Sequence, residues 1–231
     1  MRFEQNLTGK ILDPIHGIIR LTEIELAFID HPLFQRLRNI KQNTFLYKVF
    51  PSAMHSRFEH SLGVMHLSYE ILTNMGVNAH RYEKKYKDDL IYTGLTELPV
   101  HVIQELRLAA LLHDIGHGPM SHQFDSFMFS KEDFQEFFGQ DYPEISALIK
   151  DGDNVEHEHI SLLFIKVIFD SLKDEYKKLV NIDNVLAIIE KDFTSDEVCL
   201  DIDTETETLS ILPLLTSIIS SCPIDADRMD Y

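Results

Sequence analysis

Apolar residues recur three or four positions apart along most of this 231-residue chain, which is the spacing of helices. This spacing predicts six helices, over residues 31–42, 57–74, 102–115, 157–174, 182–191 and 212–221. Strand-like runs are limited to 18–21 and 197–202. Because no stretch has the length and polarity of an interdomain linker, we predict that residues 1–231 form one all-α domain with at most short two-stranded β pieces.

The predicted helix over 57–74 is apolar on more than one side, which is typical of a buried helix. Its two apolar lines are Phe58, Leu62, Met65, Tyr69 and Leu72, and Val64, Leu67 and Ile71. His60 falls on the second line, so its imidazole is predicted to point into the protein. A lone inward histidine is usually a hydrogen-bonded core residue, and only a partner elsewhere in the chain would favour a ligand.

Acidic residues outnumber basic ones by 38 to 21, which gives a formal net charge of −17. Such a charge argues against long nucleic acids and anionic membranes as partners. Residues 1–60 nevertheless hold eight basic and six acidic residues, so a small polyanion could bind there. The chain has no run of 18 apolar residues and no signal-peptide layout, and its two cysteines are too few for a disulfide framework. We therefore expect a cytoplasmic protein without a membrane partner.

A dense group of histidines and aspartates follows the strongest predicted helix, 102–115, which should end at Gly116. Its members are His113, Asp114, His117, His122 and Asp125. Packing alone does not explain so many polar groups after a buried helix, whereas a divalent metal ion would satisfy them. His60 and Asp227 are the best candidates for completing such a site. These ligand types do not distinguish among Fe, Mn, Zn, Ni and Mg.

The spacing H…HD…D, formed by His60, His113–Asp114 and Asp227, resembles that of the HD-domain metal-dependent phosphohydrolases, whose fold is a helical bundle. Five blocks resemble the deoxynucleoside-triphosphate triphosphohydrolase branch and lie in the same order along the chain. They are DPIHG (13–17), FQRLRNIKQ (34–42), RFEHSLGV (57–64), HDIGHGPMSHQFD (113–125) and DADRMDY (225–231). An isolated HD pair would carry little weight, but this combination covers nearly the whole chain.

The resemblance implies a role for each matching residue. The implied metal ligands are His60, His113, Asp114 and Asp227. The implied catalytic residues are His122, its partner carboxylate Asp125, and the further active-site histidines His117 and His157. The implied substrate-binding residues are Arg57, Gln42, Arg228 and Tyr231. Independently of the resemblance, His122 and Asp125 are three residues apart and would share a helix face. A packing role for Tyr231 is an equal alternative.

The resemblance also implies an activity, namely hydrolysis of a deoxynucleoside triphosphate to a deoxynucleoside and triphosphate, in a homo-oligomer. Asp30 and Arg38 match residues that read a guanine in an allosteric site, but neighbouring phosphate-contacting positions differ, which puts that regulation in doubt. Two alternatives stay open. One is an HD-type phosphomonoesterase or phosphodiesterase acting on another nucleotide, for which Arg57 would matter little. The other is a catalytically inactive nucleotide-binding fragment.

The end of the chain carries an expectation of its own. Asp225 is predicted to cap a helix, yet the chain stops at Tyr231, four residues after the candidate ligand Asp227. A ligand so close to a free end is poorly held. We therefore expect a domain truncated at its C-terminal end, which binds metal but hydrolyses nucleotides weakly or not at all until it is extended.

Overall fold

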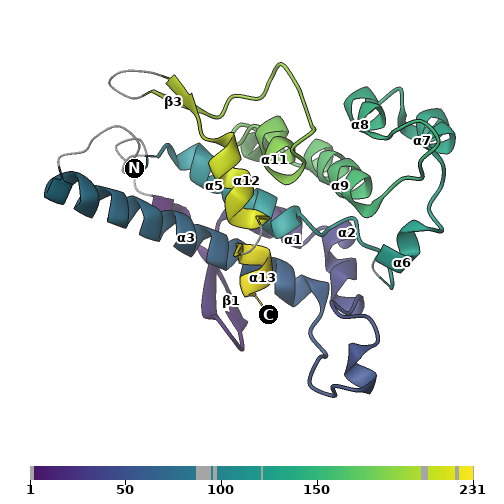
Figure 1. Ribbon diagram of the computed structural model, residues 1–231, viewed down its shortest axis with the longest axis horizontal. Helices are drawn as coiled ribbons and strands as arrows, with labels where there is room; N and C mark the ends of the chain where they lie inside the picture. The colour runs from purple at the N-terminus through teal and green to yellow at the C-terminus, as the bar shows by residue number, and fades with distance from the viewer. Residues whose placement is uncertain are drawn as a thin grey trace.

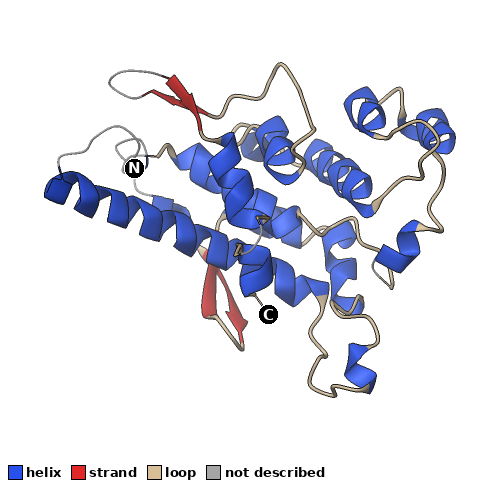
Figure 2. Ribbon diagram, in the orientation of Figure 1, coloured by secondary structure: helices blue, strands red, loops and turns tan. Residues whose placement is uncertain are grey.

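The computed structural model describes residues 3–86, 95, 98–120, 122–203, 208–221 and 224–230, and helices dominate these ranges (Figures 1 and 2). The α-helices are α1 (Glu23–Ile29), α2 (Pro32–Gln35), α3 (Arg57–Tyr86), α5 (Val100–Leu112), α6 (His122–Asp125), α7 (Lys131–Phe138), α8 (Pro143–Leu148), α9 (His157–Ser171), α10 (Asp174–Lys177), α11 (Ile182–Ile189), α12 (Leu212–Ile219) and α13 (Ala226–Met229). Three 3-10 helices are η1 (Phe3–Asn6), η2 (Arg36–Asn39) and η3 (Leu46–Lys48). The all-α class is confirmed.

Two antiparallel strand pairs accompany the helices in the described ranges, and the first of them is a hairpin. Strands β1 (Gly9–Asp13) and β2 (Gly17–Leu21) pair with Asp13 opposite Gly17, and β3 (Asp201–Asp203) pairs with β4 (Thr208–Ser210). The first hairpin turns tightly at Gly17, whose φ of 74° is readily accessible only to glycine. Figure 1 places this hairpin against the long helix α3.

The core is built around α3 and α5, which pack against each other. Every residue from Gln104 to Leu112 of α5 is buried, because α3 covers one side of this helix and α11 another. Helix α12 packs on α11 and α3, and the short α13 packs on α3. The C-terminal residues are thereby brought back onto the helix that contains His60, as the yellow ribbon in Figure 1 shows.

Several predicted boundaries were wrong. The helix expected over 31–42 is two shorter pieces, α2 and η2, and Arg36 at their junction donates to the carbonyls of Ile115 and His117. The helix expected over 57–74 continues to Tyr86, and the one over 102–115 ends at Leu112. In the expected strand 197–202, only Asp201 and Ile202 belong to β3.

No helix among the described residues is long and apolar enough to cross a membrane.

A buried ion pair joins the first hairpin to the core. The Arg107 side chain is 1% exposed and donates to Glu25 from Nε (2.7 Å) and Nη2 (2.9 Å). Nη2 also donates to the carbonyl of Arg20, and Glu25 accepts further bonds from Gln104 and from the backbone N of Thr22. Each charge therefore has several hydrogen bonds besides its ion-pair partner, which favours tolerance of such a buried pair.

Removal of one partner of this pair should destabilise the fold strongly. We expect Arg107→Met to lower the free energy of unfolding by about 3–5 kcal/mol, because the Glu25 carboxylate stays buried without its cation. The double variant Arg107→Met with Glu25→Leu should recover much of that loss. Urea denaturation measures both values, and Lys131→Met, which breaks an exposed pair with Asp151, is the control expected to change little. A loss below about 1 kcal/mol in Arg107→Met would contradict the prediction.

Candidate metal centre

The first turn of α3 positions His60. Ser56 and Glu59 form a capping box, in which the Ser56 hydroxyl accepts from the Glu59 N–H and the Glu59 carboxylate accepts from the Ser56 N–H. The Arg57 N–H donates to the carbonyl of Ile40 (2.9 Å), which ties the start of the helix to η2. His60 lies one turn into α3 and is 1% exposed, so the predicted inward orientation is confirmed.

The loop after α5 positions His113 and Asp114. His113 caps α5, and its Nδ1–H donates to the carbonyl of Ala110 (2.8 Å). The Ser161 hydroxyl on α9 donates to the His113 carbonyl (3.0 Å) and accepts from the Gly116 N–H (2.8 Å). A Cβ at Gly116 would overlap the carbonyl of His157, so glycine is required for the loop to lie this close to α9. The loop is thus held from α9 and, through Arg36, from η2.

Helix α13 brings Asp227 to the same place. Asp225 caps this helix as predicted, since its side chain accepts from the backbone N–H of Arg228 (2.8 Å) and of Ser221 (2.7 Å). The two bonds tie Ser221 and the first turn of α13 to the same side chain. Asp227 then projects from the first turn of α13 toward α3 and α5.

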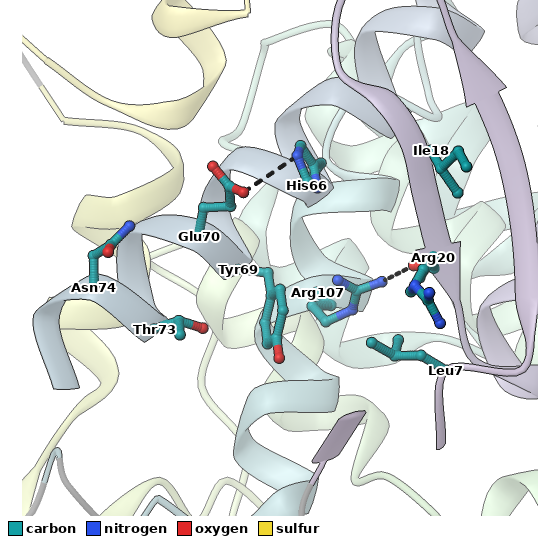
Figure 3. A pocket seen from close by; sticks show the side chains of 9 residues that line it. All are labelled: Leu7, Ile18, Arg20, His66, Tyr69, Glu70, Thr73, Asn74 and Arg107. Atoms are coloured by element: carbon teal, nitrogen blue, oxygen red, sulfur yellow. Dashed lines mark hydrogen bonds and ion pairs between the residues drawn. The ribbon is translucent and has the colours of Figure 1, made fainter. Parts of the chain in front are cut away.

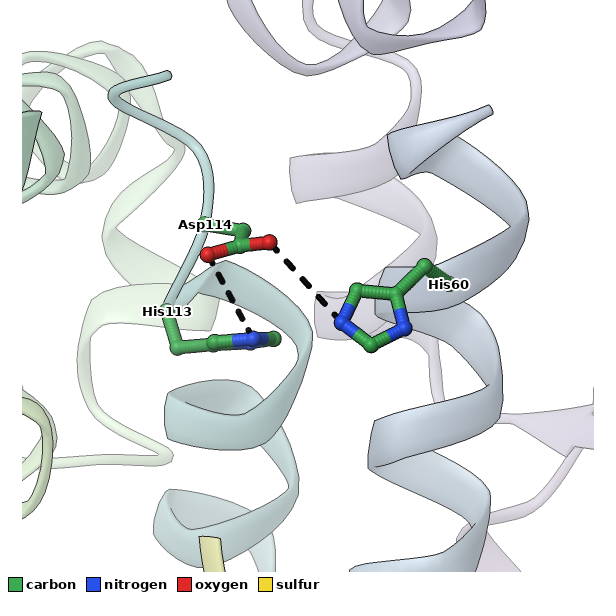
Figure 4. A group of neighbouring side chains, drawn as sticks. All are labelled: His60, His113 and Asp114. Carbon is green, nitrogen blue, oxygen red and sulfur yellow. Dashed lines mark ion pairs between the residues drawn. The ribbon is translucent and has the colours of Figure 1, made fainter. Parts of the chain in front are cut away.

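These elements bring three of the predicted ligands together, with Asp227 next to the two histidines. One nitrogen from each of His60 and His113 and one oxygen of Asp114 lie within 4.8 Å of one another (Figure 4). Asp227 Oδ1 is 2.9 Å from His60 Nε2 and 3.8 Å from His113 Nε2. Asp114 reaches both histidines, with its oxygens 3.8 Å from His60 Nε2 and 3.6 Å from His113 Nε2.

The charges of the cluster depend on one another. Burial lowers the pKa of His60, but hydrogen bonds to Asp227 and Asp230 outweigh it and raise the pKa to about 9. The pKa of His113 is also raised, because the attraction of Asp114 and Asp227 exceeds the effect of burial. Burial raises the pKa of both aspartates, yet the neighbouring cations hold the pKa of Asp114 well below its usual range and lower that of Asp227. Without a metal, protons on the imidazoles therefore balance the carboxylates.

The donor set fits a divalent metal ion. His113 Nδ1 is occupied by a backbone carbonyl, which leaves Nε2 as a buried nitrogen without a hydrogen bond, directed at the cluster. Two imidazoles and two carboxylates are ligands that suit Zn, Fe and Mn. A dication can replace the two imidazole protons without a change in net charge. His60, His113 and Asp114 thus form a candidate metal site, with Asp227 as the predicted fourth ligand.

A cavity of about 770 Å³ opens onto this cluster, within the size range of small-molecule sites. Its lining includes three of the predicted ligands together with residues from α3, α9, α11 and α12. The predicted site residues among them are Gln42, Arg57, His113, Asp114, His117, His157 and Asp227. Thr44 also lines the cavity and has a φ of 42°, unusual for a residue other than glycine.

Arg57 lies at the boundary between the cavity and the ligands. It is 4% exposed, and its Nη1 donates to Asp114 Oδ2. Removal of Arg57 would therefore disturb a candidate ligand as well as any bound phosphate, so this variant cannot separate triphosphate hydrolysis from other phosphatase activities. The backbone N–H of Gln42 donates to the carbonyl of His55 (3.2 Å), which closes the loop between these two residues. Gln42 lies at the end of this loop and lines the cavity.

Three of the four predicted catalytic residues form a connected group beside the metal cluster. His117 Nε2 is 3.3 Å from Asp114 Oδ1, and its ring stacks on that of His157 at a centroid distance of 3.7 Å. His157 Nδ1 is 3.0 Å from Asp125 Oδ2. His122 begins α6, but its side chain lies outside the described structure, so its predicted pairing with Asp125 stays a prediction.

Two predicted substrate-binding residues and two predicted guanine-binding residues remain. Arg228 is exposed on α13 and is not among the residues that line the cavity. Tyr231 lies outside the described residues. Asp30 caps the end of α1, and the Arg38 guanidinium lies over the Phe58 ring at 3.5 Å. Their part in guanine recognition stays a prediction.

A second cavity, of about 300 Å³, lies between β2 and α3, away from the cluster (Figure 3). Arg107 forms part of its wall, but its guanidinium already donates to Glu25 and to the carbonyl of Arg20. On the same wall, His66 Nε2 lies 3.6 Å from Glu70 Oε1. The larger cavity is lined by the candidate metal ligands His113, Asp114 and Asp227 and is therefore the stronger candidate for substrate binding.

Sequence reasoning missed one residue in direct contact with the cluster. Asp230 Oδ2 is 2.9 Å from His60 Nδ1, although no role was predicted for this residue. Asp230 belongs to the sequence block DADRMDY, but nothing in the residue spacing distinguished its carboxylate from those of Asp225 and Asp227.

The HD domain family matches residues 57–230. The deoxynucleoside triphosphate triphosphohydrolase SAMHD1 of Danio rerio is 43% identical over 119 residues, which cover 52% of this chain and 17% of that protein. The enzyme of the same name from Homo sapiens is 38% identical over 154 residues, 66% of this chain and 21% of that protein. An uncharacterized protein of Methanocaldococcus jannaschii is 40% identical over 124 residues, 54% of this chain and 22% of that protein. The matches thus span about a fifth of the length of these relatives.

Proposed function

The chain belongs to the HD domain family, and from this premise we propose that it is a metal-dependent phosphohydrolase that converts deoxynucleoside triphosphates to deoxynucleosides and triphosphate. The observation that carries the proposal is the position of the His60, His113 and Asp114 cluster on a cavity of about 770 Å³ whose wall includes the Arg57 guanidinium. Two of the matched relatives are named for this reaction, which supports the choice of substrate.

The residues of the cavity supply what such a reaction requires. A bound divalent ion would activate water and polarise the phosphoryl oxygens. Arg57 contributes a cation fixed next to Asp114, where it can stabilise negative charge that develops on the phosphate. Gln42 adds an uncharged hydrogen-bonding side chain on the cavity wall.

Departure of the nucleoside 5′ oxygen requires a proton donor. His122 is the proposed donor, as the resemblance implies, and it follows the loop that carries His113 and Asp114. His157 is the alternative, because its Nδ1 faces Asp125 at 3.0 Å and Glu158 at 3.1 Å. Carboxylates at Nδ1 stabilise the imidazolium, the form that can donate a proton.

A screen of the purified protein tests the proposal directly. Each of the four deoxynucleoside triphosphates would be incubated with Mn²⁺, Fe²⁺, Zn²⁺ or Mg²⁺, and the products separated by anion-exchange chromatography. Deoxynucleoside and triphosphate in equal amounts, even at a low rate, are the expected products, and EDTA should abolish them. Diphosphate or monophosphate products, or turnover of phosphomonoesters alone, would instead favour the alternative HD-type phosphatase or phosphodiesterase. Metal binding without any turnover would favour the inactive nucleotide-binding form.

Self-association is a separate part of the proposal and follows from the resemblance. Light scattering coupled to size-exclusion chromatography, with and without deoxynucleoside triphosphates, would measure it.

A further inference from the structure

His60 contacts carboxylates through both of its ring nitrogens. Nε2 faces the cluster, 2.9 Å from Asp227, whereas Nδ1 points the other way and lies 2.9 Å from Asp230 Oδ2. The Asp230 side chain is 6% exposed, so solvent has little access to this second contact. A carboxylate can only accept, and therefore Nδ1 carries the proton in this bond. Without a metal, Nε2 is protonated as well, since it faces the Asp227 carboxylate at 2.9 Å. A metal ion would take the place of the Nε2 proton, while Asp230 keeps the proton on Nδ1.

The Asp230 carboxylate is itself held from two sides. Its Oδ1 accepts from His16 Nε2 at 2.6 Å, at the tip of the first hairpin. His16 is oriented in turn by the hairpin turn, where Asp13 Oδ1 accepts from the N–H groups of Ile15 and His16 at 2.8 Å each. Asp230 thus bridges residues 16 and 60, which lie on separate elements.

Space for this carboxylate exists because residue 63 is a glycine. A Cβ built at Gly63 would overlap the carboxylate of Asp230. Gly63 lies nearly one turn after His60 on α3, so any side chain there would push the carboxylate away from the imidazole. The packing, the hairpin contact and the contact to His60 all place Asp230 at the same point.

We propose that Asp230 is a positioning residue that holds His60 in the tautomer and orientation needed to bind metal through Nε2, and that His16 holds Asp230 in place. The hairpin β1–β2 is then physically connected to the metal centre through three side chains. The inference rests on the proposed metal site but not on the identity of the substrate. Carboxylates that orient a ligating histidine typically change metal affinity by about 10- to 100-fold.

Metal affinity in the absence of nucleotide tests this inference. Isothermal titration calorimetry with Mn²⁺ should give a dissociation constant about 10- to 100-fold higher for Asp230→Asn than for the parent protein. Gly63→Ala should weaken Mn²⁺ binding in the same direction, although it alters no ligand and no hydrogen-bonding group. His16→Ala should have a smaller effect, since Asp230 keeps its bond to His60.

A spectroscopic measurement separates positioning from a general loss of structure. In the Zn²⁺-loaded parent protein, ¹⁵N chemical shifts of His60 should report a protonated Nδ1 and a metal-bound Nε2. Asp230→Asn should change the Nδ1 resonance, while its unfolding temperature without metal stays close to that of the metal-free parent. Glu70→Gln is the matched control, because Glu70 pairs with His66 on the same helix.

The outcomes are distinguishable. Unchanged Mn²⁺ affinity in folded Asp230→Asn and Gly63→Ala would overturn the inference and leave the proposed function intact. Loss of affinity in both variants, in a parent protein that hydrolyses no nucleotide, would support the inference and overturn the proposed function.

Discussion

Asp114→Asn and His113→Ala should each empty the metal site and reduce hydrolysis to background. Both residues present their ligand atoms to the centre of the cluster, and His113 Nε2 is a buried nitrogen without a hydrogen bond. Asparagine keeps the shape of Asp114 but removes the charge that balances His60, His113 and Arg57. The metal content measured by mass spectrometry should fall from about one ion per chain to near zero.

Matched controls separate this effect from a general sensitivity of the fold. His101→Ala removes an exposed histidine from the start of α5, the helix that ends at His113, and Asp151→Asn removes an exposed carboxylate. Both should retain full metal content and turnover. Because metal binding adds to folding stability, the two ligand variants should also lose the rise in unfolding temperature that added metal gives the parent. Full metal content in both ligand variants would show that the ion binds elsewhere.

The sequence predicted well those parts of the fold that depend on local pattern. The Leu- and Ala-rich run of α5 is buried as expected, and so are most residues of the two apolar lines of α3, whereas Leu67, Tyr69 and Ile71 are half-buried. The break between α2 and η2 could not be predicted in the same way, because it accompanies a contact between Arg36 and a loop about 80 residues later in the chain. Helical spacing across 31–42 contains no information about that contact.

The same distinction applies to the candidate site. His60 was identified from its place on an apolar helix face, and His113–Asp114 from the excess of polar groups after a buried helix. Asp227 was chosen only as the best remaining carboxylate, just after an apolar helix, because its approach to the other ligands depends on the packing of α13 on α3. The contacts of Arg57 with Asp114 and of Asp230 with His60 arise from tertiary packing and leave no trace in residue spacing.

His122→Ala should lower turnover by about 10²- to 10⁴-fold while metal content and unfolding temperature stay unchanged. The reason is its proposed role as proton donor to the departing 5′ oxygen, a role that involves no metal ligand. A general acid must be protonated to act, so the rate falls as the pH rises above its pKa. The alkaline limb of the kcat profile against pH should therefore be lost in this variant.

His157→Ala provides the comparison that decides between the two candidate donors. His157 stacks on His117 and pairs with Asp125, so its removal should disturb the geometry of the site but retain the alkaline limb if His122 is the acid. Loss of that limb in His157→Ala, together with its retention in His122→Ala, would assign the proton donor to His157. Loss of metal from His122→Ala, with turnover restored by added metal, would instead identify His122 as a ligand and leave His117 as the candidate acid, since its ring lies between Asp114 and His157.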